Sequence, residues 1–573
     1  MTTLPESPDR TADEQEDNTD RLLADRMLIV ASNRGPVTFM QADDGSFSSR
    51  KGSGGVVTAV SAIARDHQPV WIAAAMTEGD RARAEVARQN DEVLISPPGR
   101  KPEFRVRFVV PTPEAYHQYY NVISNPLIWF LQHYLWDTPR APDITKETWT
   151  AWEDGYVAVN RLFAEEILKA ASGAAQEPII MLQDYQLYLC GGFIREQRPN
   201  AIIQHFVHIP WPDPDYWRLL PLLMRRAICE GLLGNDIVGF QTRDHARSFM
   251  YTCEAYVPNC QIDYARRGII WNGRRIEVRA YPISIDVESV RRAAYSQEAR
   301  NHERYMPNYW NQHTVLRVDR AEPSKNIVRG FEAFDRFLEM HPDFQGRTNF
   351  VALTFGFSRM DVEEYQDYLR DISDVVFRIN AKYANVETGW QPIHVIMGEN
   401  YPRALAAMKW YDVLLVNTII DGMNLVAKEG CLLNERNGVL ILSEGAGAAN
   451  QLGEDAIMIA PADVEGTALA IHRALTMPLA ERRRRAEHLR QSVESDDITV
   501  WFREQLWDIV RYTIRGERDP GAILPDEMDG RSNGTTRGQV VSSIPSSGGS
   551  DGQVKSGSRR GREDRQRTRH DRG

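Results

Sequence analysis

Two successive series of short apolar runs constrain the fold of this chain more than any other feature of its sequence. Each run ends in polar side chains, and amphipathic segments such as 324–341 separate the runs. Continuous apolar runs of this length are typical of parallel strands that helices cover on both faces. Two such series predict an α/β protein with two doubly wound domains. The first series comprises residues 27–33, 177–185, 201–211 and 235–242, and the second comprises 313–319, 349–355, 393–398, 411–417 and 438–445.

The chain is long enough for two domains of this kind. A length of 573 residues exceeds what one hydrophobic core organises, and two domains of about 200–250 residues fit it. We therefore expect one Rossmann-like domain at 27–285 and a second at 286–485. Residues 1–26 are acidic and polar, and residues 516–573 are rich in Gly, Ser, Arg and Asp, so both are predicted to be disordered tails.

Composition argues against several classes of function. The formal net charge of -11 disfavours a general nucleic-acid or membrane-surface binder, so we expect neither partner. The five cysteines form no CxxC pair, which disfavours a disulfide framework or a zinc knuckle and favours a reducing cytoplasm. The acidic N-terminus does not resemble a signal peptide, and no stretch approaches the roughly 20 apolar residues that span a bilayer.

A pair of cations follows the strand-like run at 313–319. Arg320 and Lys325 lie five residues apart, where a strand is expected to pass into a helix. Two fixed cations at such a turn can neutralise the diphosphate leaving group of an activated substrate. Asp319 beside them could orient the arginine. The alternative is a strand end with solvated charges, and spacing alone leaves both interpretations open.

The segment IIDGMNLVAKEG, residues 419–430, follows another strand-like run. An unusual turn at Gly422 would let three successive amides open a helix, where N–H groups and the helix dipole favour phosphate. Asp421 would then face a sugar, and Glu429, one to two turns further on, could accept hydrogen bonds from ribose. An Asp-Gly turn that only caps a helix is the simpler alternative. The three amide donors are those of Asn424, Leu425 and Val426.

The segment FVHIPWPDPDYW, residues 206–217, contains a histidine and a DxD sequence. His208 ends a very apolar strand and must find a partner there, and a satisfied core histidine is the usual explanation. The DxD at 213–215 is similar to the metal site of metal-dependent glycosyltransferases, but Pro212 and Pro214 favour a rigid loop. We therefore expect no metal site.

Weaker signals suit the binding of phosphate or sugar. SGGVV, with Gly54 and Gly55, is the nearest approach to a Gly-rich phosphate loop, although a surface turn would look the same. SNR and SR follow two further strand-like runs and place arginines at the edges of sheets. Aromatic residues between 119 and 136 are typical of a core, and sugar sites also favour aromatic platforms. The residues concerned are Arg34, Arg359, Tyr120 and Trp129.

Taken in their order along the chain, these motifs resemble those of the trehalose-6-phosphate synthases, glycosyltransferase family 20. The resemblance covers about residues 27–515 and rests on SNR with a downstream SGG, YYN…LIW…HY, DYQL, HIPWP, GFQT, R-x4-K, SRMDVEEYQDY and DGMNLVAKE. It implies a GT-B fold, in which two Rossmann-like domains face each other across a cleft. It also implies that a helical segment, 486–515, crosses back onto the first domain.

The resemblance implies a retaining, metal-independent reaction without a cofactor. Glucose would pass from UDP-, GDP- or ADP-glucose to glucose 6-phosphate and give α,α-trehalose 6-phosphate, while the leaving phosphate takes the acceptor proton. The sequence does not fix the nucleotide base. No phosphatase-type DxDxT segment appears, so a dephosphorylated product would require a separate phosphatase. A homo-oligomer is compatible with the sequence.

The resemblance also assigns roles by position. Arg320 and Lys325 would grip the donor diphosphate, and His208 and Asp421 would contact the transferred glucose. The first domain would be the acceptor side and the second the nucleotide-sugar side. The implied donor-binding residues are Gly54, Gly55, Asn424, Leu425, Val426 and Glu429, and the implied acceptor-binding residues are Arg34, Tyr120, Trp129, Asp184 and Arg359.

The chain departs from the family pattern at two places. Gln183 and Gln186 flank DY where the family usually has His, and A-E-P-S-K-N follows Arg320 where the family reads L-D-Y-x-K-G. These differences, with HIPWPDPDYWRLLP, are similar to the pseudoglycosyltransferase that joins a nucleotide-activated cyclitol to an aminocyclitol phosphate, forming validoxylamine 7′-phosphate. DGMNLVAKE and SRMDVEEYQDY favour the synthase. A catalytically silent sugar-phosphate sensor is a third hypothesis, which the retained charged residues of both motifs disfavour.

Overall fold

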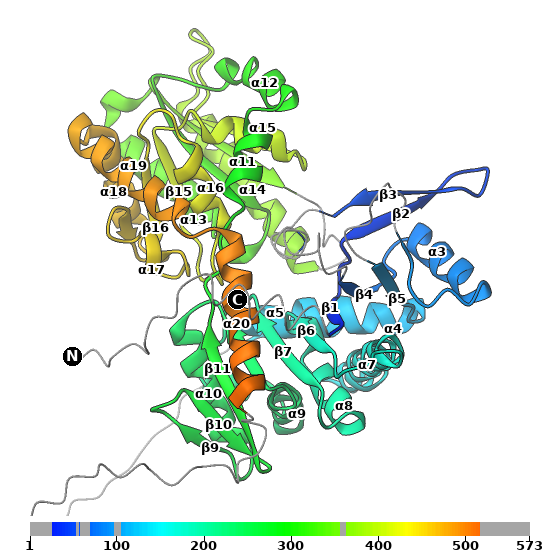
Figure 1. Ribbon diagram of the computed structural model, residues 1–573. Helices are drawn as coiled ribbons and strands as arrows, with labels where there is room; N and C mark the ends of the chain where they lie inside the picture. Colours follow the sequence, from blue (N-terminus) through cyan, green and yellow to red (C-terminus); the bar gives the residue numbers. More distant parts are fainter. Residues whose placement is uncertain (1–25, 53–56, 58–68, 97–104, 356–362, 516–573) are drawn as a thin grey trace, which may run out of the picture. The chain divides into compact units, whose positions relative to one another are not determined.

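The computed structural model describes residues 26–52, 57, 69–96, 105–355 and 363–515 (Figure 1). Two parallel sheets with helices on their faces account for most of these residues, which confirms the predicted α/β class. The two predicted disordered tails, apart from Arg26, lie outside the described residues. No helix in the described part of the chain is long and apolar enough to cross a membrane.

The first sheet has nine strands in the order β5–β4–β1–β6–β7–β8–β11–β10–β9. The strands from β5 to β11 run parallel, and β10 and β9 add antiparallel pairs at one edge. The central strands are fully buried, as their continuous apolar runs require. The bounds are β1 Leu28–Ser32, β4 Val70–Ala74, β5 Arg105–Val109, β6 Ile179–Gln183, β7 Ile202–Val207, β8 Ile237–Phe240, β9 Gln261–Asp263, β10 Gly268–Trp271 and β11 Arg274–Ala280.

The second sheet has six strands, all parallel, in the order β14–β13–β12–β15–β16–β17. A separate antiparallel hairpin joins β2 to β3. The bounds are β12 His313–Arg320, β13 Thr348–Phe355, β14 Ile393–Met397, β15 Val413–Val416, β16 Val439–Ser443 and β17 Ile457–Ile459, with β2 Val37–Gln41 and β3 Phe47–Lys51 in the hairpin.

Both parallel sheets reverse their strand order once, at a defined point. In the first sheet β4 and β5 lie on one side of β1, and the strands that follow them in sequence, from β6 onward, lie on its other side. In the second sheet the same reversal lies between β12 and β15. Ligands of open parallel sheets bind at the carboxyl ends of the two strands that flank such a switch point. The topology therefore directs attention to the residues that follow these four strands.

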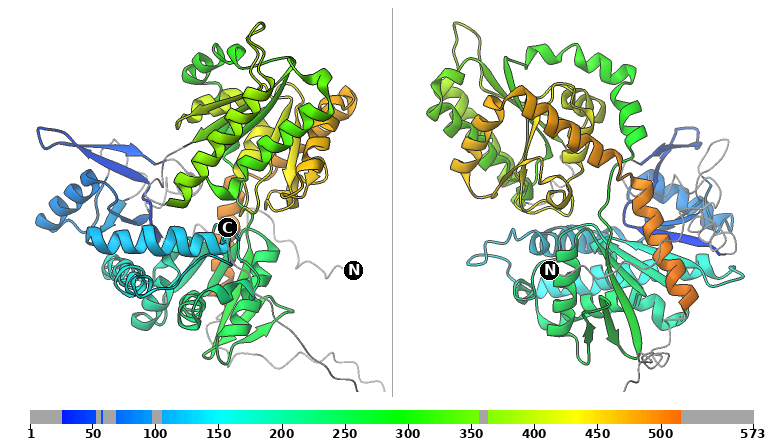
Figure 2. Two further views of the ribbon diagram at one scale, coloured as in Figure 1. Left: turned by 180° about the vertical axis from the view of Figure 1, so that it is seen from behind. Right: turned by 60° about the vertical axis from the view of Figure 1, so that its left-hand side comes forward.

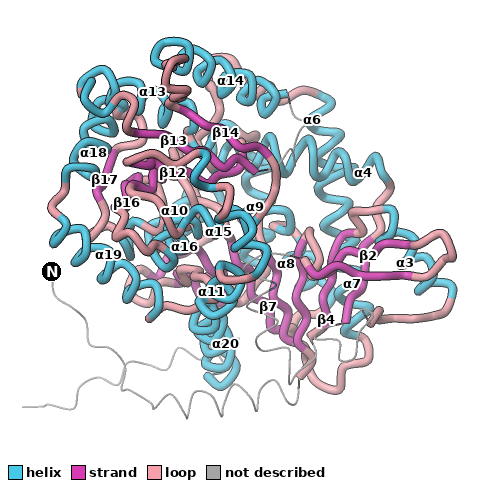
Figure 3. The backbone as a smooth tube through the Cα atoms, turned by 90° about the horizontal axis from the view of Figure 1, so that it is seen from above, coloured by secondary structure: helices cyan, strands magenta, loops and turns pink. Residues whose placement is uncertain are grey.

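Helices cover both faces of the second sheet (Figure 3). In α13 the apolar residues Ile327, Phe331, Phe334 and Leu338 recur at helical spacing, so one stripe of the helix is buried. They form one hydrophobic core with α14 and α18, whereas α11, α15 and α16 pack into another. The bounds are α11 Val287–Ala294, α12 Gln297–Glu303, α13 Ile327–Met340, α14 Glu363–Tyr383, α15 Tyr401–Met408, α16 Leu425–Leu433, α17 Ala449–Leu452, α18 Val464–Thr476 and α19 Leu479–Glu494.

Two π-helical segments distinguish the helices around the first sheet. Segment η1 spans Gln118–Ile128 and η2 spans Ala151–Val157, and the two pack against each other. Gly155 makes this approach possible, because a Cβ there would lie 2.6 Å from the Cβ of Gln118. The other helices are α3 Glu78–Gln89, α4 Pro113–His117, α5 Trp129–Gln132, α6 Lys146–Thr150, α7 Ala158–Ala171, α8 Cys190–Gln197, α9 Leu222–Leu233 and α10 Arg243–Tyr256.

The last helix, α20 (Ile498–Arg515), lies against the first sheet although it follows the helices of the second (Figure 2). Its Gln505 accepts a hydrogen bond from Gln204 of β7 at 2.7 Å. The start of α20 contacts the segment that joins the first sheet to α11. There Ile498 N donates a hydrogen bond to the carbonyl of Ile285 at 3.1 Å. The expected segment boundary at residue 486 falls inside α19, and the chain turns into α20 only after Glu494.

Candidate active site

The two cations predicted from the sequence follow β12, the first strand at the switch point of the second sheet. Arg320 ends β12, and Lys325 ends the 3-10 turn Pro323–Lys325. The Lys325 ammonium group forms an ion pair with the carboxylate of Asp421. Arg320 remains about half exposed, with its Nε 3.3 Å from the carboxylate of the buried Glu322. Both cations line one cavity.

Asp319 does not orient Arg320, so that expectation is wrong. Residues 317 and 319 lie on one face of the strand and residue 320 on the other, because side chains alternate. Asp319 instead pairs with the buried Arg317, whose Nη2 lies 2.9 Å from the carboxylate. The same Nη2 donates to the carbonyl of Lys325 at 2.8 Å. The aspartate therefore holds the turn that positions Lys325.

Helix α16 begins at the cavity, after β15 at the other side of the switch point. Its N-cap is Asn424, whose backbone is left-handed with a φ of 77°. The Asn424 side chain accepts from Ala427 N at 3.1 Å and donates to the Asp421 carboxylate at 3.1 Å. The amides of Leu425 and Val426 belong to the first turn, which has no intrahelical acceptors for them. They line the cavity and, with the helix dipole, favour an anion there.

Gly422 does not form the unusual turn that the sequence suggested. It allows a close contact between the two sheets. Positive φ occurs at Asn424, and Gly422 is not among the residues that adopt it. A Cβ at Gly422 would lie 2.0 Å from the carbonyl oxygen of His208, which follows β7 of the first sheet. The absence of a side chain therefore lets the loop after β15 contact the first sheet directly.

Asp184 and His208 meet at the carboxyl ends of β6 and β7. Asp184 has φ 72° and ψ 174°, a conformation that residues other than glycine rarely adopt and that is associated with functional sites. Its carboxylate accepts from His208 N at 3.2 Å. Burial lowers the pKa of His208 to about 3, so the imidazole is neutral near pH 7. Its Nε2 lies 3.0 Å from Oε1 of Gln183, the last residue of β6.

Residues from both sheets line a cavity of about 340 Å³, and His208 is among them, whereas Asp184 and Gln183 are not. The Lys325–Asp421 pair is buried, and although burial opposes both charges, each partner stabilises the other. The pKa of Lys325 is therefore raised and that of Asp421 lowered, so both are ionised at neutral pH. The first sheet contributes His208, Gln241 and Ile283 to the lining, and the second contributes Val318, Asp319, Arg320, Lys325, Asp421, Met423, Asn424, Leu425 and Val426.

Glu429 lies one turn further along α16 and does not line this cavity. Its carboxylate accepts a hydrogen bond from the hydroxyl of Tyr401 at 2.8 Å. Burial raises the pKa of Glu429 to about 7, although the Tyr401 hydrogen bond favours the charged form. The group is thus poised to change charge near neutral pH.

Two of the predicted acceptor residues, Arg34 and Tyr120, do not line the cavity. Arg34 follows β1 and is exposed. Tyr120 lies in η1 and stacks on Tyr116 with ring centres 5.6 Å apart. The hydroxyl of Tyr116, a residue of α4, accepts from the side chain of Asn33 at 3.2 Å, which connects α4 to the end of β1.

Trp129 adjoins the cavity through one further ring. It is buried and stacks on His133 with ring centres 4.0 Å apart. Burial lowers the pKa of His133 to about 4, while the charge of Asp421 opposes this shift and that of Lys325 favours it. His133 thus contacts Trp129 and lies within range of the charges of the Lys325–Asp421 pair.

The remaining predicted features are the Gly-rich segment, Arg359 and the DxD sequence. Gly54, Gly55 and Arg359 lie outside the described residues. In the DxD segment, Asp213 accepts from the Ser248 hydroxyl at 2.9 Å and Asp215 pairs with Arg218 at 2.9 Å. Within the described ranges, no group of three or more His, Cys, Asp or Glu side chains could hold a metal ion.

Sequence reasoning assigned no role to Gln183, Gln241 or Tyr401. Gln241 lines the cavity, and its Oε1 fixes the backbone by accepting from Ile283 N at 2.9 Å. Gln183 and Gln241 both stand at strand ends, a position that could have marked them. Tyr401 follows the segment MGEN and carries no signal of its own in the sequence.

Comparison with known proteins identifies the family. The model of glycosyltransferase family 20 matches residues 26–511. The UDP-forming α,α-trehalose-phosphate synthase of Schizosaccharomyces pombe is 32% identical over 514 residues, covering 87% of this chain and 94% of the relative. Synthase A of Dictyostelium discoideum is also 32% identical, over 83% of this chain, but this chain spans only 61% of that relative's length.

Solved structures agree with this result. A structure described as "Trehalose-6-phosphate from E. coli bound with UDP-2-fluoro glucose" matches with a TM-score of 0.73 and 26% identity, covering 85% of this chain and 99% of that one. A UDP-forming synthase from Burkholderia vietnamiensis matches with a TM-score of 0.70 and 28% identity, covering 87% and 99%. These matches confirm the predicted GT-B fold and the expectation of a hexosyltransferase. The chain therefore belongs to glycosyltransferase family 20.

Proposed function

We propose that this protein transfers glucose from UDP-glucose to glucose 6-phosphate and forms α,α-trehalose 6-phosphate with retention at the anomeric carbon. One observation carries the proposal: the Lys325–Asp421 pair and the first amides of α16 line a single cavity that residues of both sheets enclose. Such a site can hold an anionic leaving group against a sugar. The named relatives supply the choice of UDP as the leaving nucleotide.

The donor diphosphate is placed against Lys325, Arg320 and the α16 amides. Negative charge on the leaving phosphate grows as the bond from the anomeric carbon to the phosphate oxygen breaks. Fixed cations and amides then bind the transition state more tightly than the ground state. They supply the positive charge that a divalent ion provides in metal-dependent transferases, which supports a metal-independent reaction.

The carboxylates near the cavity already bind other groups of the protein. This supports a retaining reaction in which no carboxylate acts as the nucleophile. Asp421 is paired with Lys325 and Asn424, and Asp184 accepts from His208 N. The acceptor hydroxyl attacks the anomeric carbon from the face that the diphosphate leaves. A new C–O bond forms, the C–O bond to phosphate breaks, and the acceptor proton passes to the departing phosphate oxygen.

Arg34, Tyr120, Trp129 and Asp184 are proposed to bind the acceptor, and Glu429 the ribose of the donor. Gly54, Gly55 and Arg359 keep the roles implied by the resemblance, on the donor phosphates and the acceptor phosphate. A cytoplasmic location is supported by the five cysteines, none of which forms a disulfide. Conversion of the product to an unphosphorylated sugar is assigned to a separate phosphatase.

A matrix of donors and acceptors tests the proposal. UDP-, GDP- and ADP-glucose and a nucleotide-activated cyclitol are each combined with glucose, glucose 6-phosphate and an aminocyclitol phosphate, with and without EDTA, and nucleotide release and product mass are measured. We expect turnover with UDP-glucose and glucose 6-phosphate that EDTA does not abolish. Turnover only with a nucleotide-activated cyclitol and the aminocyclitol phosphate would replace the proposal with the pseudoglycosyltransferase, and binding without turnover would indicate a sensor.

A further inference from the structure

A second cavity, of about 660 Å³, lies in the helices beside the first sheet. It is enclosed by η2, α8, α9 and the turn between β10 and β11, and it shares no lining residue with the cavity between the sheets. Its volume falls in the range of small-molecule sites, roughly 300–1,000 Å³. The family's reaction gives this cavity no role.

Three tryptophans give the cavity its character. Trp149 precedes η2, Trp152 lies within it, and Trp271 ends β10 on the opposite side. Trp152 is only 3% exposed, and its indole N–H has no hydrogen-bond partner among the described residues. Buried indole N–H groups normally find an acceptor. The cavity is therefore lined by aromatic rings and by an indole N–H group to which an oxygen atom of a ligand could accept a hydrogen bond.

Two exposed carboxylates complete the lining, and neither has a protein partner within the described part of the chain. Glu153 follows Trp152 in η2, and Glu196 lies near the end of α8. The third carboxylate, Glu230, is already paired with Arg226 at 2.7 Å. Trp152 and Glu153 both belong to a π-helical turn, a rare conformation that is frequent at functional sites. The polar groups without a partner among the described residues thus include both acceptors and donors.

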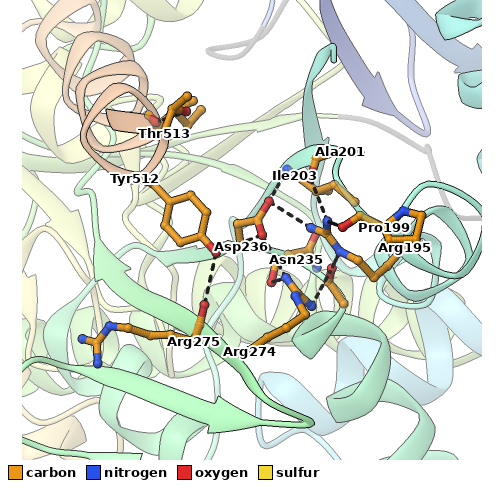
Figure 4. A network of polar contacts seen from close by, with 12 residues as sticks. Arg195, Pro199, Ala201, Ile203, Asn235, Asp236, Arg274, Arg275, Tyr512 and Thr513 are labelled. Atoms are coloured by element: carbon orange, nitrogen blue, oxygen red, sulfur yellow. Dashed lines mark hydrogen bonds and ion pairs between the residues drawn. The ribbon is translucent and has the colours of Figure 1, made fainter. Parts of the chain in front are cut away.

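The two arginines at the cavity both form ion pairs with one aspartate of the protein (Figure 4). Arg195 and Arg274 each place an Nη2 2.9 Å from the buried carboxylate of Asp236, which also accepts from the Tyr512 hydroxyl of α20 at 3.1 Å. The Nε and Nη1 atoms of Arg195 donate hydrogen bonds to the carbonyls of Pro199, Ala201 and Gly234, at 2.7–2.9 Å. The positive charges of both arginines are therefore compensated within the protein, and Asp236 connects them to α20.

We propose that this cavity is a binding site for an uncharged saccharide. The C–H faces of a pyranose ring pack on indole rings, and its hydroxyl groups can both donate to Glu153 and Glu196 and accept from Trp152. Phosphorylated sugars and nucleotides are excluded, because the unpaired charges at the cavity are all negative. A simple organic cation would satisfy the carboxylates but would leave the Trp152 N–H without an acceptor.

Saturation-transfer NMR with trehalose as the probe tests this site in the full-length protein. UDP and glucose 6-phosphate are present at saturation, so that the cavity between the sheets is filled. We expect trehalose to bind and expect Trp271→Ala to raise its dissociation constant about tenfold. Trp152→Phe, which keeps a ring but removes the N–H, and Glu153→Gln should each weaken binding. Tyr264→Ala, an exposed aromatic beside the same strands that does not line the cavity, is the matched control.

The outcomes separate the alternatives. No saturation transfer to trehalose, or binding that Trp271→Ala leaves unchanged, would overturn the proposal. Binding of trehalose only when UDP and glucose 6-phosphate are omitted would place the sugar in the other cavity and overturn the proposal. Binding of arginine in preference to trehalose would show a site for organic cations. Trp271 is only half-buried at the end of β10 and Glu153 is exposed in η2, so these variants are expected to fold.

Discussion

The ammonium group of Lys325 is paired with the carboxylate of Asp421, across the point where the second sheet reverses its strand order. Lys325 follows β12 and Asp421 follows β15, and these strands are neighbours. The pair fixes the lysine before a donor binds, so little reorganisation is needed when charge develops on the leaving group. Arg320 and the amides of α16 extend the same anion site.

Removal of either cation should slow the chemical step. We expect Lys325→Ala and Arg320→Ala each to lower kcat on the order of 10²–10³-fold, because their contacts strengthen in the transition state. The double variant should lose less than the product of both effects, since the two groups share one ligand. Steady-state kinetics measure this, with circular dichroism to check the fold. Arg336→Ala, an exposed arginine on α13 paired with Glu465, is the control. Near-normal kcat and donor KM in either single variant would refute the assignment.

Gly422 should tolerate no side chain. A Cβ there would meet the His208 carbonyl at 2.0 Å, so Gly422→Ala must push the loop after β15 away from the first sheet. A displacement of about 1 Å in a catalytic site can cost about 10²-fold, and we expect a loss of kcat/KM of this order. Gly173→Ala is the matched control, because a Cβ at Gly173 meets nothing within 4 Å. Full activity of Gly422→Ala would mean that this contact is not needed.

Glu429 should make donor binding depend on pH. Its pKa is raised to about 7, so in the free protein it is neutral below this pH and becomes a carboxylate above it. The carboxylate is the better acceptor for ribose hydroxyl groups, so affinity should rise with pH. We expect the Kd of UDP-glucose to fall about tenfold from about pH 6 to about pH 8. Calorimetric titration checks this, and Glu429→Gln should flatten the profile. An equal slope in that variant would assign the effect to another group.

Gln183 should act as a positioning residue for His208. Its Oε1 lies 3.0 Å from Nε2, which fixes the ring and the tautomer that carries a proton on Nε2. Gln183→Leu keeps the approximate volume but leaves the buried imidazole without this acceptor, and kcat should fall about tenfold. Gln183→His restores the residue usual in the family and should retain activity. Nitrogen NMR of the imidazole should show a changed tautomer in Gln183→Leu, and an unchanged tautomer with unchanged kcat would contradict the role.

The sequence predicted the strands that carry the site, because buried parallel strands leave a long and unbroken apolar signal. It also predicted that α16 would begin within DGMNLVAKE, where the structure places Leu425. The strands β9, β10 and β11, towards one edge of the first sheet, escaped prediction because they are short or only partly buried and carry no continuous apolar run.

The tertiary contacts of the site could not be predicted from the sequence. Which carboxylate Arg317 or Lys325 binds depends on strand alternation and on the pairing of β12 with β15, and neither is encoded by local spacing. Gly422 looked like a turn residue because a close approach to His208, more than 200 positions away along the chain, leaves no local trace. The roles assigned to individual site residues stay predictions until variants are measured.

The most direct measurement is proton NMR of the product that the purified protein makes from UDP-glucose and glucose 6-phosphate. We expect a disaccharide monophosphate in which both anomeric protons show the small coupling of α linkages, formed in step with UDP release. A product with one β linkage would contradict retention, and the absence of any 1,1-linked disaccharide phosphate would contradict the proposed function itself.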